Sequence, residues 1–142
     1  MRTEARELAF KLIFERLFVK ENYTFDEEFF AVLKKEEDRN FAKDLILKFE
    51  ANRSEIEGVV NSKLIGYSLD RVYKVDLALL YLAVTEIKYI QTPFQIVINE
   101  VVNFSKQFST EKSSRFINGV LSAIVKDQND WSNNRFKTKH IH

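Results

Sequence analysis

The chain contains no cysteine, one proline, three glycines and two histidines among its 142 residues. The lack of cysteine excludes disulfide bonds and thiolate metal sites, and it suits a reducing compartment such as the cytoplasm. Sheet proteins need many tight turns, and tight turns use glycine and proline. The scarcity of both residues therefore predicts an all-α protein with long helices and few connections.

Long hydrophobic runs are also missing. The longest apolar stretch, Leu77 to Val84, is far too short to span a bilayer. The N-terminal segment is charged from Arg2 onward, and no secretory signal region follows it. We therefore expect a cytoplasmic protein with no membrane association.

Catalytic motifs are absent as well. Both histidines, His140 and His142, lie in a polar C-terminal stretch, so no nucleophile with a positioned base can be identified. The sequence has no glycine-rich phosphate loop and no zinc-binding histidine motif. These absences predict a binding protein without enzymatic activity, cofactor or metal site.

Apolar residues recur at helical spacing over most of the chain. Leu77 to Val84 is apolar nearly all round, which is typical of a central core helix. Thr92-Pro93 predicts a break followed by a new helix, and Ser109 to Glu111 predicts a second restart. The pattern leaves open whether residues 39–64 form one bent helix or two.

Three residues inside the last predicted helices are poor helix formers. Gly119 suggests a close approach of another element. Asn99 and Asn118 suggest buried hydrogen bonds between helices. We expect the last helix to reach about Asp127, so residues 1–128 form a single helical domain. Residues 129–142 form a polar, basic and flexible tail.

Charge is unevenly distributed, although the net charge is only +1. Residues 21–57 carry eleven acidic and six basic side chains, whereas residues 105–142 carry seven basic and three acidic ones. The first helix adds basic groups of its own. A nearly neutral protein with a basic face can bind RNA, although uneven surface charge alone does not require it.

Several segments together resemble the NusB family of transcription antitermination factors. They are Ala5-Arg6-Glu7-Leu8-Ala9, Asp76 with the apolar helix ending in Glu86-Ile87, Thr92-Pro93, Ile98-Asn99-Glu100-Val101-Val102, Ser105-Lys106-Gln107-Phe108, and Arg115-Phe116-Ile117-Asn118-Gly119-Val120-Leu121. Each segment alone is weakly specific, but their combined spacing is distinctive. The resemblance covers nearly the whole chain and is weakest between residues 20 and 65.

This resemblance implies about seven helices in two small packed bundles. It also implies binding of boxA-type single-stranded RNA together with NusE, a ribosomal protein that doubles as a transcription factor. The pair would join an antitermination complex on RNA polymerase and support ribosomal RNA transcription.

Five residues suit the RNA-binding role that the resemblance implies. Arg2 and Arg6 are four residues apart, so they share a helix face and could reach phosphates. Lys112 and Arg115 are three residues apart beside Phe116. Cations next to an aromatic ring often hold single-stranded RNA. Phe116 also begins an apolar stripe, so it could equally belong to the core.

By resemblance, the NusE surface includes Phe14 and Asp76. We expect the Asp76 carboxylate to point to solvent from the first turn of its helix, where an exposed acid would suit a basic ribosomal protein. Alternatively, Asp76 only stabilises its own helix dipole.

Two other functions remain open from the sequence. The chain could be the NusB-like module found at the front of certain ribosomal RNA cytosine methyltransferases, or a helical adaptor that binds only protein.

Overall fold

The structure is a computed structural model that describes residues 2–19, 27–64, 66 and 71–141, with the backbone alone for 128–141. Every regular element in these ranges is a helix, which confirms the all-α prediction. The elements are α1 (Arg2–Arg16), η1 (Glu27–Val32), α2 (Glu36–Ala51), α3 (Arg53–Asn61), α4 (Lys74–Thr85), η3 (Glu86–Ile90), α5 (Phe94–Phe108) and α6 (Glu111–Ile141). The short segment η1 is a 3₁₀-helix, and η3 is one π-helical turn.

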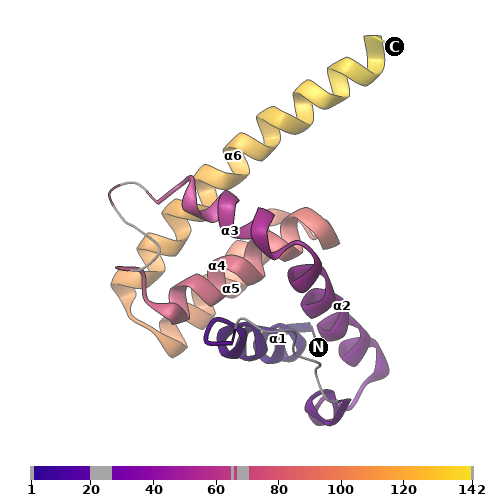
Figure 1. Cartoon of the computed structure of the whole chain (residues 1–142), viewed down its shortest axis with the longest axis vertical. Coiled ribbons are helices and arrows are strands. Elements are labelled where there is room, and N and C mark those ends of the chain that lie inside the picture. The colour runs from indigo at the N-terminus through magenta and orange to yellow at the C-terminus, as the bar shows by residue number, and fades with distance from the viewer. Residues whose placement is uncertain (1, 20–26, 65, 67–70, 142) are drawn as a thin grey trace.

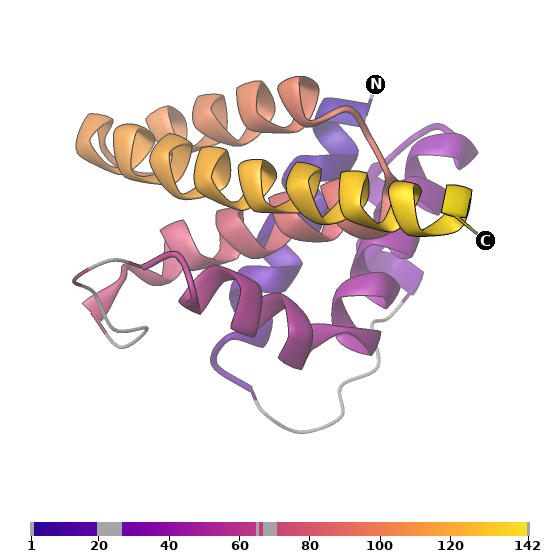
Figure 2. The ribbon, with the colours of Figure 1, turned by 90° about the horizontal axis from the view of Figure 1, so that it is seen from above.

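Helix α4 lies at the centre of the molecule (Figure 1). Every residue from Asp76 to Thr85 is buried, which confirms the predicted central helix. It contacts the other five α-helices, so two groups of helices share it as their core. Helices α1 and α2 pack together in one group, and α5 and α6 pack together in the other (Figure 2).

The helix boundaries follow local backbone chemistry. Residues 39–64 form two helices, because α2 ends at Ala51 and α3 begins at Arg53. Asn52 joins them with φ −124° and ψ 22°, and its side chain donates a 2.9 Å hydrogen bond to the carbonyl of Lys48. The predicted break at Thr92-Pro93 is confirmed. Gln91 adopts a left-handed φ of 64°, and α5 begins directly after the proline.

Helix α6 begins at Glu111, as predicted, but continues to Ile141 instead of ending near Asp127. No glycine or proline follows Gly119, so the local sequence contains no residue that would break the helix. Figure 1 shows its far end projecting beyond the other helices.

Two expectations about helix interiors are wrong. Gly119 is exposed, and a Cβ atom added there would meet no atom within 4 Å, so no close approach requires the glycine. Asn99 and Asn118 are also exposed, so they do not form buried hydrogen bonds between helices. All three residues lie on the outer faces of their helices. A low helix propensity does not indicate whether a residue inside a helix is buried or exposed.

Candidate nucleic-acid interface

A pocket of about 390 Å³ lies between the segment leading into α4 and the first turns of α6. Four of its lining residues come from the α4 side, namely Arg71, Val72, Tyr73 and Asp76. The other four come from the α6 side, namely Thr110, Lys112, Ser113 and Phe116. The pocket thus brings together segments that are far apart in the sequence.

Side-chain hydrogen bonds fix the start of α6. The backbone N–H of Ser113 donates to the Thr110 hydroxyl oxygen at 3.0 Å, which is the geometry of a helix N-cap. The Ser113 hydroxyl in turn donates to Asp76 Oδ2 at 2.8 Å. The first turn of α6 is therefore tied to the first turn of α4, and Lys112 lies between these anchored residues.

Three of the predicted RNA-binding residues lie on this turn and the next. Lys112 and Arg115 are exposed, as expected, and their three-residue spacing places them on neighbouring parts of one helix face. Phe116 is half-buried: it packs against the core and also lines the pocket. Phe116 thus contributes to the core and also remains at the pocket, where a base could reach it.

Asp76 does not point to solvent, and that expectation is wrong. The residue is only 3% exposed. Its Oδ1 accepts a hydrogen bond from the Ser109 hydroxyl at 3.0 Å, and its Oδ2 accepts the one from Ser113. These serines lie more than thirty residues further along the chain, so only the packing of α5 and α6 against α4 could reveal them.

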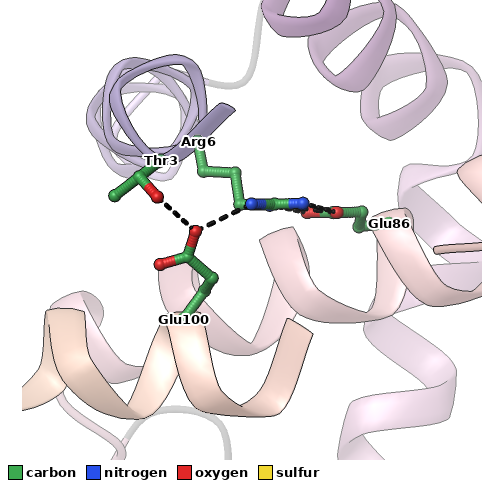
Figure 3. Close-up of polar contacts among 4 residues, drawn as sticks. All are labelled: Thr3, Arg6, Glu86 and Glu100. Carbon is green, nitrogen blue, oxygen red and sulfur yellow. Dashed lines mark hydrogen bonds and ion pairs between the residues drawn. The ribbon is translucent and has the colours of Figure 1, made fainter. Parts of the chain in front are cut away.

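Arg6 is not available to phosphates, which corrects its predicted role. It is 4% exposed, and its guanidinium lies between two glutamates (Figure 3). Arg6 Nε and Nη2 donate to the Glu86 carboxylate, both at 2.7 Å, and Nη1 donates to Glu100 Oε1 at 2.8 Å. Thr3 donates to the same Glu100 oxygen at 2.6 Å. This network joins α1 to η3 and α5.

The surroundings of Arg6 keep it charged. Burial alone lowers the pKa of Arg6, but the hydrogen bonds and negative charges of Glu86 and Glu100 outweigh burial and raise the pKa above its ordinary value. Two carboxylates thus compensate the charge of the buried guanidinium, and these ion pairs hold α1 against η3 and α5.

Arg2 remains exposed at the start of α1. Its guanidinium carbon lies 4.6 Å from the centre of the Phe41 ring, which is a cation–π contact with α2. Both residues line a shallow hollow that also includes Glu37, Asn40 and Lys43. Of the two arginines predicted on the first helix, Arg2 is therefore the one that a phosphate could reach.

Phe14, predicted as a partner contact, is half-buried near the C-terminal end of α1. Its ring meets that of Phe18 edge-on at 5.2 Å between centroids, and Phe18 is 62% exposed. Phe18 is therefore the exposed member of this aromatic pair, and Phe14 supports it from the core side.

The sequence did not identify Arg71 and Tyr73 as site residues, although both line the pocket. Arg71 is exposed, and Tyr73 is 67% exposed, directly before α4. Their sequence context offers only a cation and an aromatic residue near a helix start. Nothing local indicates that Lys112 and Phe116 lie opposite them.

Among the described residues, no three His, Cys, Asp or Glu side chains are grouped so that they could hold a metal ion. The side chain of His140 and the whole of His142 lie outside what the structure describes. No described helix is long and apolar enough to cross a membrane.

Comparisons with known proteins agree on one family. A family model described as the NusB family matches residues 3–126. The transcription antitermination protein NusB of Listeria innocua is 37% identical over 125 residues, which cover 87% of this chain and 95% of the relative. The protein of the same name from Finegoldia magna is 34% identical, with 88% and 93% coverage.

Solved structures support the same fold. NusB of T. maritima superposes with a TM-score of 0.78 at 28% identity, covering 89% of this chain and 91% of that one. A crystal structure of the antitermination factors NusB and NusE in complex with double-stranded RNA gives a TM-score of 0.78 at 28% identity, with 89% and 96% coverage.

Proposed function

Because the chain belongs to the NusB family of transcription antitermination proteins, which are not enzymes, we propose that it binds boxA-type single-stranded RNA together with NusE. A relative of the same fold has been solved with NusE and double-stranded RNA, which supports NusE and RNA as its partners. The bound pair would act in the cytoplasm as part of the antitermination complex on RNA polymerase, and so support ribosomal RNA transcription.

The observation that carries the RNA-binding role is the cluster of exposed cations beside aromatic rings at the start of α6. Lys112 and Arg115 are exposed, Phe116 borders the pocket, and Tyr73 lies exposed across from it. Cations neutralise phosphates, whereas rings stack on unpaired bases, so this combination fits single-stranded RNA better than a duplex. Arg2 offers a further exposed cation at the start of α1.

The aromatic pair Phe14 and Phe18 is the better candidate for the NusE surface. Exposed aromatic rings are frequent at the centres of protein interfaces. Asp76, the other residue assigned to NusE by resemblance, is only 3% exposed, and both of its carboxylate oxygens accept serine hydroxyls.

The salt dependence of RNA binding tests the α6 site. Each phosphate contact to single-stranded RNA contributes about −0.7 to the slope of log K against log salt. Lys112→Ala and Arg115→Ala should each weaken binding and flatten the slope by about this amount. Lys126→Ala is the matched control, because Lys126 is an exposed cation on the same helix, about 21 Å beyond Lys112.

Fluorescence anisotropy titrations of a labelled boxA-type RNA at several salt concentrations would measure both quantities. Equal losses in all three variants would show that the RNA responds to overall charge, and the α6 site would be rejected. Thermal melts of the same samples should coincide, because all three side chains are exposed.

A further inference from the structure

The pocket between α4 and α6 could bind one part of the RNA, and this inference rests on the proposed function. We propose that this pocket holds one unpaired guanine base of the bound RNA, with Asp76 as its hydrogen-bond acceptor. The volume of about 390 Å³ lies within the range of small-ligand sites, which is about 300–1,000 Å³.

The Asp76 carboxylate supplies a fixed acceptor at the pocket. Each of its oxygens accepts one serine hydroxyl, from Ser109 or Ser113. A carboxylate oxygen can accept about two hydrogen bonds, so each oxygen retains capacity for one more donor. The serines hold the carboxylate in one orientation, which spares a ligand the cost of ordering it.

The charges around the pocket favour RNA over a basic protein. Arg71 and Lys112 line the pocket, and both are exposed. Lys74 and Arg115 add exposed cations on the flanking turns, and Glu111 adds one exposed acid. A cationic segment approaching Asp76 would have to pass these basic groups, whereas RNA phosphates on either side of an inserted base would be attracted to them.

Two rings provide walls on which a base can stack. Tyr73 comes from the α4 side and Phe116 from the α6 side. Stacking on aromatic side chains is the usual way in which proteins hold bases that have left a helix. Stacking alone accepts any base, so the choice among bases falls to Asp76, the acidic residue that lines the same pocket.

That polar group selects guanine. An ionised carboxylate only accepts hydrogen bonds, so it prefers the base edge with the most donors. Guanine presents N1–H and N2–H side by side on its Watson–Crick edge, which matches the two oxygens of Asp76. Cytosine and adenine offer one exocyclic amino group beside a ring acceptor, and uracil offers one N–H between two carbonyls that a carboxylate would repel.

Base substitution in a short RNA tests the assignment. The probes are labelled uridine oligoribonucleotides in which one central nucleotide is guanosine, inosine or uridine. Inosine lacks the 2-amino group but keeps N1–H. The wild-type protein should bind the guanosine oligomer at least about fivefold more tightly than the inosine oligomer. Asp76→Asn should abolish this preference, because the amide replaces one of the two acceptor oxygens with a donor.

Two further variants keep the test decisive. Tyr73→Ala changes an exposed side chain, so it should fold even if Asp76→Asn does not, and it too should reduce the guanosine preference. Asp127→Asn is the control, because Asp127 is an exposed aspartate on α6, paired with Lys63, about 16 Å beyond Phe116. It should retain the full preference.

The other outcomes separate the two proposals. Equal binding of guanosine and inosine oligomers, with Lys112→Ala still weakening both, overturns the guanine pocket and leaves RNA binding intact. No binding of any oligomer, even at low salt, or of boxA-type RNA overturns both proposals. A loss of affinity for purified NusE in Asp76→Asn, with the base preference unchanged, would make the pocket a protein contact and overturn the assignment.

Discussion

Arg6 and Lys11 lie on the same helix and each pairs with a glutamate, yet the two pairs differ in exposure to solvent. The side chains of Arg6 and Glu86 are 5% and 0% exposed, whereas those of Lys11 and Glu7 are 54% and 35% exposed. Water screens the second pair, so its contribution to stability is small. The first pair has no such screening, and removal of one partner leaves a buried charge unmatched.

We predict that Arg6→Ala lowers the free energy of unfolding by about 3–5 kcal/mol, because Glu86 and Glu100 lose their common cation. Lys11→Ala should cost less than about 1 kcal/mol. Urea unfolding of both variants measures the difference. If the two variants unfolded at the same urea concentration, the Arg6 network would not be a determinant of stability.

Two tyrosines respond to their surroundings in a similar way. Burial, followed by the charge of Glu57, raises the pKa of Tyr81 to about 12. Burial and the 2.7 Å hydrogen bond to Glu55 raise the pKa of Tyr89 to about 12. The ordinary value is about 10, so the folded protein favours the neutral phenol in both cases. Their contribution to stability is therefore complete below pH 10 and declines as the pH rises toward 12.

We predict that Tyr81→Phe and Tyr89→Phe each reduce this alkaline loss of stability. The ultraviolet absorbance of tyrosinate, followed against pH, should show one high-pH transition fewer in each variant. Removal of a transition near pH 10 by Tyr81→Phe would contradict the assigned environment.

At the scale of single elements, the three glycines differ in what their backbones require. Gly58 and Gly119 lie inside α3 and α6, and an added Cβ would meet nothing within 4 Å at either position. Gly66 lies outside these helices with a φ of +78°, in the region that favours glycine. Space for a Cβ atom therefore does not by itself show that a glycine can be replaced by alanine, because the backbone conformation must also allow it.

We predict that Gly58→Ala and Gly119→Ala each stabilise the protein by about 0.5–1 kcal/mol, because alanine is the better helix former. Gly66→Ala should destabilise it by about 1–2 kcal/mol through the left-handed backbone. Thermal unfolding of the three single variants compares them directly. Destabilisation by Gly58→Ala would mean that α3 tolerates no side chain at that position.

At the scale of the whole molecule, the extent of the folded domain remains our proposal. We place it at residues 1–128, with residues 129–142 as a basic tail. Ile124 and Val125 are 2% and 6% exposed, and Asp127 pairs with Lys63 next to the end of α3. The family match ends at residue 126. Core packing therefore extends almost to this boundary.

We predict that a chain ending at Gln128 keeps the urea midpoint of the full chain, whereas a chain ending at Ser122 is strongly destabilised because it lacks Ile124 and Val125. The chain ending at Gln128 also lacks Arg135, Lys137 and Lys139. For each phosphate contact that one of these residues makes, its slope of log K against log salt for RNA binding should be less steep by about 0.7. A lower midpoint for the chain ending at Gln128 would place the domain boundary further along α6.

Features that depend on neighbouring residues could be predicted from the sequence alone. The scarcity of glycine and proline predicted the all-α class, the apolar run from Leu77 predicted the central helix, and Pro93 marked the start of α5. Propensity, periodicity and helix breaking act over a few residues, so they can be read along the chain. The exposure of Lys112 and Arg115 could also be predicted, since charged residues seldom lie buried without a partner.

The partners of the buried charged residues, in contrast, depend on how the helices pack. Arg6 meets Glu86 and Glu100 at separations of 80 and 94 residues. Asp76 meets Ser109 and Ser113, and the same packing places Tyr73 across from Phe116. A period of 3.6 residues indicates which side chains share a face, but it does not indicate which other helix covers that face. For this reason the sequence predicted the cations of the site, whereas the pocket and the burial of Arg6 and Asp76 follow from how α1, α5 and α6 pack on α4.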